Sequence, residues 1–248
     1  MAIDIRNMTA LITGGAKRVG RATALALANA GANVVVHYRS SSAEADELVE
    51  DIRRLGVHGW AVQADLSDGT QLGSLMACAI AEVGPIHILI NNASAFPKSD
   101  FDSVTLREVV DSVTTDAWAP FALAREFAKQ PEARHIINML DTRVFSEYDW
   151  QHFAYNAGKH MLTLFTKMMA VKLAPQIAVN AVAPGLILPP EGMPLSYIEG
   201  LKDDLPLKRI GSPEFVAEAI LFLVRTEFIT GQVIFVDGGR HLREVGCG

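Results

Sequence analysis

The chain has 248 residues, of which 50% are hydrophobic and 20% charged, and this composition excludes an intrinsically disordered protein. Its 22 lysines and arginines against 28 aspartates and glutamates give a formal net charge of -6, so nucleic acid is not an expected partner. No apolar stretch approaches the roughly 18 residues of a membrane-spanning helix, and the N-terminus lacks the features of a signal peptide, which indicates a cytoplasmic protein without membrane association.

The first regular elements that the sequence predicts are strands. Short runs rich in valine and isoleucine recur along the chain, as they do in the buried strands of parallel sheets. We expect seven strands, at residues 9–13, 33–37, 58–63, 86–90, 135–138, 177–182 and 233–236.

Longer segments with helical periodicity separate these runs, at residues 18–30, 42–55, 70–82, 106–129, 153–173 and 213–226. The alternation predicts a single α/β domain over residues 1–248, a Rossmann-type doubly wound fold with a seven-stranded parallel sheet and helices on both faces. Residues 186–207 interrupt the alternation with four prolines. Because ligands bind outside the carboxyl ends of the strands in such sheets, this insertion is a candidate substrate lid.

The first predicted strand runs into a glycine-rich loop, residues 13–20, and then into a helix. Backbone amides at such a helix start favour phosphate, so we expect pyrophosphate binding near Gly14, with added positive charge from Lys17 and Arg18. The dinucleotide fingerprint would place a glycine near position 18, where this chain has arginine. The alternative is a glycine-rich turn without a ligand.

The end of the second predicted strand bears on cofactor choice. Sites that prefer NAD place an acid here, and sites that prefer NADP place basic or hydroxyl groups. This strand ends with Tyr38, Arg39 and Ser40, and no carboxylate occurs before Glu44. We therefore expect NADP(H), with Arg39 and Ser40 contacting its phosphate. The alternative is that Arg39 is simply a solvated residue.

Tyr155 and Lys159 are four positions apart within a predicted helix, so they share one helix face. An ammonium beside a phenol stabilises the phenolate, and we expect Lys159 to lower the pKa of Tyr155 and so prepare it for proton transfer. Taken alone, such a pair is common on surface helices.

These motifs occur together in an order and spacing that resemble the short-chain dehydrogenase/reductase family along nearly the whole chain. Also matching are Ala64 to Leu66, Asn91 to Ala93, Asn180, Ala183 to Gly185, Gly231 and Val236 to Gly239. The resemblance implies that Tyr155 donates a proton and that Lys159 holds the nicotinamide ribose. It also implies a set of cofactor-binding residues: Gly14, Lys17, Arg18, Val19, Tyr38, Arg39, Ser40, Asp65, Leu66, Asn92, Ala93, Ser94, Tyr155, Lys159, Pro184 and Gly185.

Two residues depart from the general pattern of that family. Asp141 follows the fifth predicted strand, where most members have a serine that polarises the substrate oxygen. Asp116 lies at the helix position that usually holds an active-site asparagine. A proton relay through that asparagine is therefore not expected here.

The aspartate at 141 is shared with the pteridine reductases and the similar dihydromonapterin reductases, which the chain also resembles in its glycine loop and in residues 91–96. This resemblance implies that Ser94 contacts cofactor and pterin, and that Phe96 stacks on the pterin ring. A carboxyl group together with a tyrosine can relay the proton that reduction of a C=N bond requires. The alternative for Asp141 is a helix cap or turn acid.

We therefore expect an NADPH-dependent reductase of a dihydropterin, with Asp141, Tyr155 and Lys159 as catalytic residues and with Ser94, Phe96, Asp141 and Tyr155 binding the substrate. One alternative is a carbonyl reductase of the 3-oxoacyl or sugar type, and another is a catalytically weak NADP(H)-binding protein.

His152 and His160, which flank Tyr155, are assigned structural roles. By resemblance, the helix at 153–173 builds a four-helix interface of a homotetramer. The two cysteines, Cys78 and Cys247, lie far apart and match no disulfide or zinc pattern, so no metal is expected.

Overall fold

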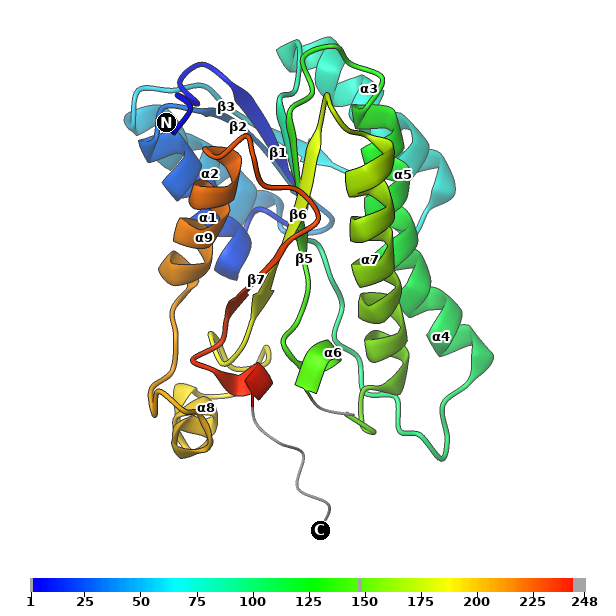
Figure 1. Ribbon diagram of the computed structural model, residues 1–248. Coiled ribbons are helices and arrows are strands. Elements are labelled where there is room, and N and C mark those ends of the chain that lie inside the picture. Colours follow the sequence, from blue (N-terminus) through cyan, green and yellow to red (C-terminus); the bar gives the residue numbers. More distant parts are fainter. Residues whose placement is uncertain (1, 147–148, 243–248) are drawn as a thin grey trace.

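In the computed structural model, which describes residues 2–146 and 149–242, seven parallel strands form one twisted sheet with helices packed on both faces (Figure 1). Cys247 lies outside the described residues. The order of the strands is β3-β2-β1-β4-β5-β6-β7, so the chain winds outward first in one direction and then in the other. The predicted fold class is confirmed. Within the described residues, no helix combines the length and the apolar character needed to span a membrane.

The strands end within two residues of their predicted limits. They are β1 (Thr9–Ile12), β2 (Asn33–Tyr38), β3 (Gly59–Gln63), β4 (Ile88–Asn91), β5 (His135–Met139), β6 (Ala178–Pro184) and β7 (Val233–Val236). Alternate side chains of β1 enter different layers, because successive residues of a strand face opposite sides of a sheet. Ala10 and Ile12 pack in the core beneath α1 (Arg18–Asn29), α2 (Ser42–Arg54) and α9 (Pro213–Val224), and Leu11 packs on the other face.

The second face of the sheet is covered by α3 (Gly69–Val83), α5 (Ala119–Phe127) and α7 (Phe153–Lys172), with α4 (Leu106–Val113) packed against α7 (Figure 1). Side chains of α3, α5 and α7, among them Leu75, Phe127 and Met169, meet Leu11 and Ile136 of the strands there. The helices cover the two faces of the sheet, and the loops at the carboxyl ends of the strands form the site.

The predicted helix at 106–129 is divided, which the sequence did not indicate. A π-helical segment, η1 (Thr114–Trp118), joins α4 to α5 without leaving the helix axis. Such a segment places one extra residue in a turn and often lies at a functional site. Here it carries Asp116, whose side chain is fully buried.

The predicted lid is more regular than its prolines indicated. It contains α8 (Leu195–Glu199) and a 3-10 turn, η2 (Lys202–Asp204). Leu186, Ile198 and Leu205 form a small apolar cluster of their own, and this cluster explains why the insertion folds. The short helix α6 (Arg143–Ser146) and the 3-10 turn η3 (Arg240–Leu242) complete the described elements.

Candidate active site

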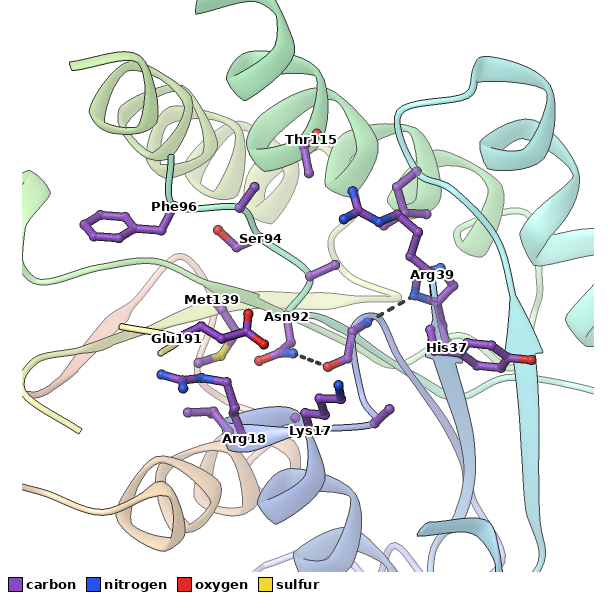
Figure 2. Close-up of a pocket in the computed structure, with 18 of the residues that line it drawn as sticks. Lys17, Arg18, His37, Arg39, Asn92, Ser94, Phe96, Thr115, Met139 and Glu191 are labelled. Atoms are coloured by element: carbon purple, nitrogen blue, oxygen red, sulfur yellow. Dashed lines mark hydrogen bonds between the residues drawn. The ribbon is translucent and has the colours of Figure 1, made fainter. Parts of the chain in front are cut away.

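A cavity of about 600 Å³ lies at the carboxyl ends of the strands (Figure 2). Every site residue predicted from the sequence lines it: Gly14, Lys17, Arg18, Val19, Tyr38, Arg39, Ser40, Asp65, Leu66, Asn92, Ala93, Ser94, Phe96, Asp141, Tyr155, Lys159, Pro184 and Gly185. The structure thus brings together residues that are up to 171 positions apart in the chain.

The glycine loop forms one wall of the cavity. Gly14 has a φ of +59, and a side chain there would press against the Ala93 backbone, since its Cβ would lie 3.0 Å from Ala93 Cα. A Cβ on Gly20 would lie 2.4 Å from the Gly14 carbonyl oxygen. The helix α1 that follows has no side-chain cap and no acid in its first turn. Its first amides therefore remain available to an anion.

Arg18 explains why glycine is the usual residue at its position. Its φ is +54, in the left-handed region that is costly for side chains with a Cβ. Its guanidinium donates a hydrogen bond of 2.6 Å from Nη2 to the carbonyl oxygen of Pro189. This hydrogen bond connects the glycine loop to the lid.

His37 is a residue of the cavity that sequence reasoning missed. Its Nδ1 accepts a hydrogen bond of 3.1 Å from the Gly14 amide, drawn in Figure 2, and its Nε2 lies 3.1 Å from the Ala64 carbonyl oxygen. Burial lowers the pKa of His37 to about 4. A histidine directly after three valines, near the carboxyl end of the predicted strand, was the available signal.

Asn92 holds the glycine loop from the opposite side. Its Nδ2 donates to the carbonyl oxygens of Thr13 and Gly14, at 3.0 and 2.9 Å. The hydroxyl of Thr13 accepts the amides of Asn92 and Ala93, both at 3.0 Å. The loop is therefore held between β2 and β4 by hydrogen bonds from both sides.

The end of β2 carries the residues expected to select the cofactor. Arg39 and Ser40 are exposed at the rim of the cavity. Lys17 reaches the same rim and forms an ion pair of 2.6 Å with Glu44. The pKa of Asp65 is lowered, chiefly by hydrogen bonds from Ser67 and also by the charge of Arg39.

The predicted catalytic residues meet at the inner end of the cavity. The Tyr155 hydroxyl donates a hydrogen bond of 3.0 Å to Oδ2 of Asp141. The Lys159 Nζ is buried, donates to the Met139 carbonyl oxygen at 2.9 Å and lies 3.5 Å from Oδ1 of Asp116. Asp141 is thus within hydrogen-bonding distance of the tyrosine, although its Oδ1 also accepts the Arg143 amide, as a turn acid would.

The expected lowering of the Tyr155 pKa is contradicted. Burial raises the pKa of Tyr155 well above its usual value, and the negative charges of Asp141 and then Asp116 raise it further. Lys159 is directed at Met139 and Asp116, and its Nζ lies 5.7 Å from the centre of the Tyr155 ring. The phenol is therefore a hydrogen-bond donor in this site.

Phe96 lies in an aromatic group at the mouth of the cavity. Its ring stacks on His152 with 3.8 Å between centroids and meets Tyr155 edge-on at 4.7 Å. The Arg143 guanidinium is 5.0 Å from the Phe96 centroid, and Asp149 accepts hydrogen bonds from both Arg143 and His152. His152, which was assigned a structural role, thus contacts Phe96, a residue predicted to bind the substrate. His160 is exposed, and its Nδ1 lies close to the Asn156 carbonyl oxygen.

Comparison with known proteins gives one matching family and several similar chains. A family described as enoyl-(acyl carrier protein) reductase matches residues 14–241. A 3-oxoacyl-(acyl-carrier-protein) reductase, FabG, of Staphylococcus epidermidis is 32% identical over 95% of this chain and 100% of its own length.

Many solved structures are also similar, and two of them were crystallised with a nicotinamide cofactor as follows. FolM alternative dihydrofolate reductase 1 from Brucella canis, complexed with NADP, has a TM-score of 0.91 and 32% identity over 99% of this chain and 98% of its own. A blue fluorescent protein from a metagenomic library, in complex with NADPH, has a TM-score of 0.88 and 27% identity over 96% of this chain and 99% of its own.

Proposed function

The chain belongs to the short-chain dehydrogenase/reductase family, and we propose that it is an NADPH-dependent reductase that transfers hydride to a C=N bond of a dihydropterin. The coarser part of this statement, an NADP(H)-dependent oxidoreductase, follows from the family and from the NADP complexes of its structural neighbours. The dihydropterin substrate rests on the chemistry of residues at the cavity.

The residues present fit the cofactor. The glycine loop admits no further side chain at Gly14 or Gly20, and the uncapped start of α1 offers amides to a pyrophosphate. Lys17 and Arg39 add positive charge at the rim where a 2'-phosphate is expected. When bound, NADPH supplies the hydride; Lys159 and Asn92 are assigned to its nicotinamide end.

The single observation that carries the pterin proposal is the hydrogen bond between Tyr155 and Asp141. Reduction of a C=N bond adds hydride to carbon and requires one proton on nitrogen. We assign that proton to the Tyr155 hydroxyl, with Asp141 accepting hydrogen bonds from the substrate. A carboxylate is an acceptor for the amino and ring N–H groups of a pterin, whereas a ketone offers no such donor.

Phe96 and Ser94 are assigned to the substrate. Both line the cavity, and the flat Phe96 ring already makes a stacked contact with another planar group, His152. A pterin ring is a planar group of the same kind. The similarity to a dihydrofolate reductase of the FolM type supports this assignment.

Steady-state oxidation of NADPH tests the proposal with four substrates: dihydrobiopterin, dihydromonapterin, dihydrofolate and an acetoacetyl thioester. We expect turnover of at least one of the pteridines, with the thioester slower. Turnover of the thioester alone would end the pterin proposal.

That outcome would establish the second candidate, a 3-oxoacyl reductase. The 32% identity to the staphylococcal FabG favours it. Against it stands Asp141, since a ketone oxygen needs a hydrogen-bond donor and an ionised carboxylate has none to offer. A third candidate, an NADP(H)-binding protein with weak activity, would show cofactor binding and no turnover with any of the four substrates.

We further propose that the chain forms a homotetramer through α4, η1 and α7. Exposed apolar patches of this kind often mark protein–protein interfaces. The large apolar side chains that these elements expose are Leu106, Val110, Trp118, Met161, Leu164, Met168 and Val171. Leu162 and Met169, from the same stretch of α7, are buried in the core. One face of α7 thus packs in the core, and its exposed apolar face supports the proposal of an interface.

A further inference from the structure

Asp237 directly follows β7 and is a buried carboxylate, with 2% of its side chain exposed. Its Oδ2 accepts a hydrogen bond of 2.6 Å from the Thr142 hydroxyl, and its Oδ1 accepts the Gly239 amide at 2.9 Å. Oδ2 also accepts the backbone amide of His241 at 2.7 Å. It lies 2.8 Å from the Nδ1 of the same residue, which must donate because a carboxylate can only accept. One carboxylate thus joins the C-terminal turn η3 to the loop after β5.

A glycine lets Asp237 approach the loop after β6 as well. Pro184 of β6 pairs with Val236 of β7, and the Gly185 amide donates to the Val236 carbonyl oxygen at 3.0 Å. A Cβ on Gly185 would lie 2.7 Å from both the Cα and the Cβ of Asp237, so there is no room for a side chain. Asp237 therefore lies where the carboxyl ends of β5, β6 and β7 meet.

The C-terminal turn is also packed onto α6 by aromatic rings. Phe235 stacks on the His241 ring with 3.9 Å between centroids, and Phe145 of α6 meets Phe235 edge-on at 4.8 Å. α6 and η3 accordingly lie side by side at this end of the sheet (Figure 1). The turn around Asp237 is thus held by ring contacts as well as by hydrogen bonds.

Thr142 is the residue through which Asp237 reaches the catalytic side of the cavity. It is fully buried, and it is held from two directions. Its amide donates to the Pro184 carbonyl oxygen at 3.1 Å, while its hydroxyl donates to Asp237. The position of Thr142 is therefore set by both β6 and the residue after β7.

Asp141 precedes Thr142 in the same turn. Its Oδ2 accepts the Tyr155 hydroxyl at 3.0 Å, and its Oδ1 accepts the Arg143 amide at 2.8 Å. Both contacts require that the backbone of this turn keep its direction, because a carboxylate on so short a side chain cannot compensate for a displaced backbone. A hydrogen bond that holds Thr142 therefore also orients Asp141.

We propose that Asp237 is a positioning residue that, through the Thr142 hydroxyl, fixes the turn in which Asp141 faces Tyr155. The C-terminal turn η3 is then a supporting part of the active site. The inference rests on the proposed function for what Asp141 does in a reaction. Its physical content is the order of one turn, which can be measured without a substrate.

The test compares Thr142→Val, which keeps the shape of the side chain and removes the hydroxyl, with Thr142→Ser, which keeps the hydroxyl. Exchange of the Arg143 amide hydrogen with solvent is measured by nuclear magnetic resonance in the protein without cofactor. This amide reports on the turn because it donates to Asp141. We expect exchange about 10-fold faster in the valine variant and close to wild type in the serine variant.

Kinetics supply the second readout. In Thr142→Val, we expect kcat for the active substrate to fall about 10-fold, while KM and the Kd for NADPH stay within about twofold of wild type. Thr142→Ser should recover kcat. Asp237→Asn should also lower kcat, because an asparagine amide cannot accept from all the donors around it. Combining it with Thr142→Val should add little, since both changes break one interaction.

The matched control is Thr166→Val, which removes another fully buried hydroxyl. That hydroxyl donates to the Leu162 carbonyl oxygen at 2.8 Å and accepts the Asn138 amide at 2.9 Å. The control should lower thermal stability and leave Arg143 exchange and kcat unchanged. If Thr142→Val does not fold, Thr142→Ala takes its place in the comparison with serine.

Four results would overturn the proposal. They are unchanged Arg143 exchange in Thr142→Val, unchanged kcat in that variant, an equal effect in Thr142→Ser, or an equal effect in Thr166→Val. If the wild type reduces no pteridine, the proposed substrate fails, while the exchange rates still support or overturn the role of Asp237.

Discussion

The imidazole of His37 accepts the backbone amide hydrogen of Gly14 across 3.1 Å, so a strand side chain fixes the loop expected to bind pyrophosphate. To accept there, Nδ1 must be unprotonated, and the other ring nitrogen then donates to the Ala64 carbonyl. The shape of the glycine loop therefore depends on a neutral histidine.

The first prediction is that this histidine makes stability fall in acid. Burial lowers the pKa of His37 from 6.5 to about 4 in the folded chain, so the unfolded chain binds more protons between these values. The stabilisation is complete above pH 6.5 and is lost as pH falls towards 4, with an upper limit of about 3 kcal/mol. Urea unfolding at several pH values measures it.

The variant His37→Gln should flatten this dependence, whereas the exposed His58→Gln should leave it unchanged. His135, whose pKa burial also lowers to about 4, will keep part of the slope in both variants. An identical slope in His37→Gln and wild type would contradict the prediction.

The second prediction separates the backbone and the side chain of Arg18. Its left-handed φ costs an alanine more than a glycine, so Arg18→Gly should be more stable than Arg18→Ala by about 1 kcal/mol. Both variants lose the guanidinium and its hydrogen bond to Pro189, and both should bind NADPH more weakly. Thermal unfolding and fluorescence titration with NADPH measure the two effects. Equal stabilities would show that the backbone at position 18 is not strained.

The third prediction concerns cofactor preference. Arg39→Asp replaces a cation at the rim with an acid and should lower the ratio of kcat/KM for NADPH over NADH by about 10- to 100-fold. Arg54→Asp, on the exposed side of α2, is the control and should leave that ratio unchanged. An unaltered ratio in Arg39→Asp would exclude a role in phosphate binding.

The fourth prediction concerns Asp141. Asp141→Ser restores the residue usual in the family and should reduce turnover of the pteridine substrate by about 100-fold or more. NADPH affinity should remain close to wild type, because the carboxylate is directed at Tyr155. Tyr155→Phe should show a loss at least as large. A serine variant with undiminished pteridine turnover would remove Asp141 from the reaction.

The fifth prediction tests self-association. Leu164→Glu places a charge in the exposed apolar surface of α7 and should shift the protein towards smaller species in sedimentation. Leu55→Glu, at the end of α2, changes an exposed leucine elsewhere and serves as the control. The same sedimentation coefficient in all three proteins would exclude α7 from any interface.

The sequence predicted the sheet and the cavity well because both depend on local patterns. Short apolar runs that alternate with longer helical segments are typical of buried parallel strands, and parallel strands bring their carboxyl-end loops to one edge of the sheet. That is why Gly14, Arg39, Asn92 and Tyr155 were found in advance, although the roles of these residues in binding and catalysis remain predictions.

What the sequence did not indicate depends on contacts between distant segments. The π-helical turn at Asp116 is stabilised by Ser94 and Lys159, which no helical periodicity reveals. The pKa of Tyr155 is raised, whereas the sequence predicted that it would be lowered. Helix spacing shows that Lys159 is near Tyr155, but it does not show that the Lys159 ammonium contacts Met139 and Asp116. The order within the lid arises from the cluster of Ile198 with residues on either side of it.

Because all seven strands are parallel, the loops at their carboxyl ends and the connections at their amino ends lie at opposite ends of the sheet. The carboxyl ends of its strands hold every predicted site residue, while the opposite ends meet the segment before β1 and the short connections at residues 30–32, 55–58, 84–87, 128–134, 173–177 and 225–232. Insertions and substitutions at the amino ends of the strands can alter thermal stability without reaching the cavity. Selection for heat tolerance and selection for a new substrate can therefore act on separate parts of one small chain.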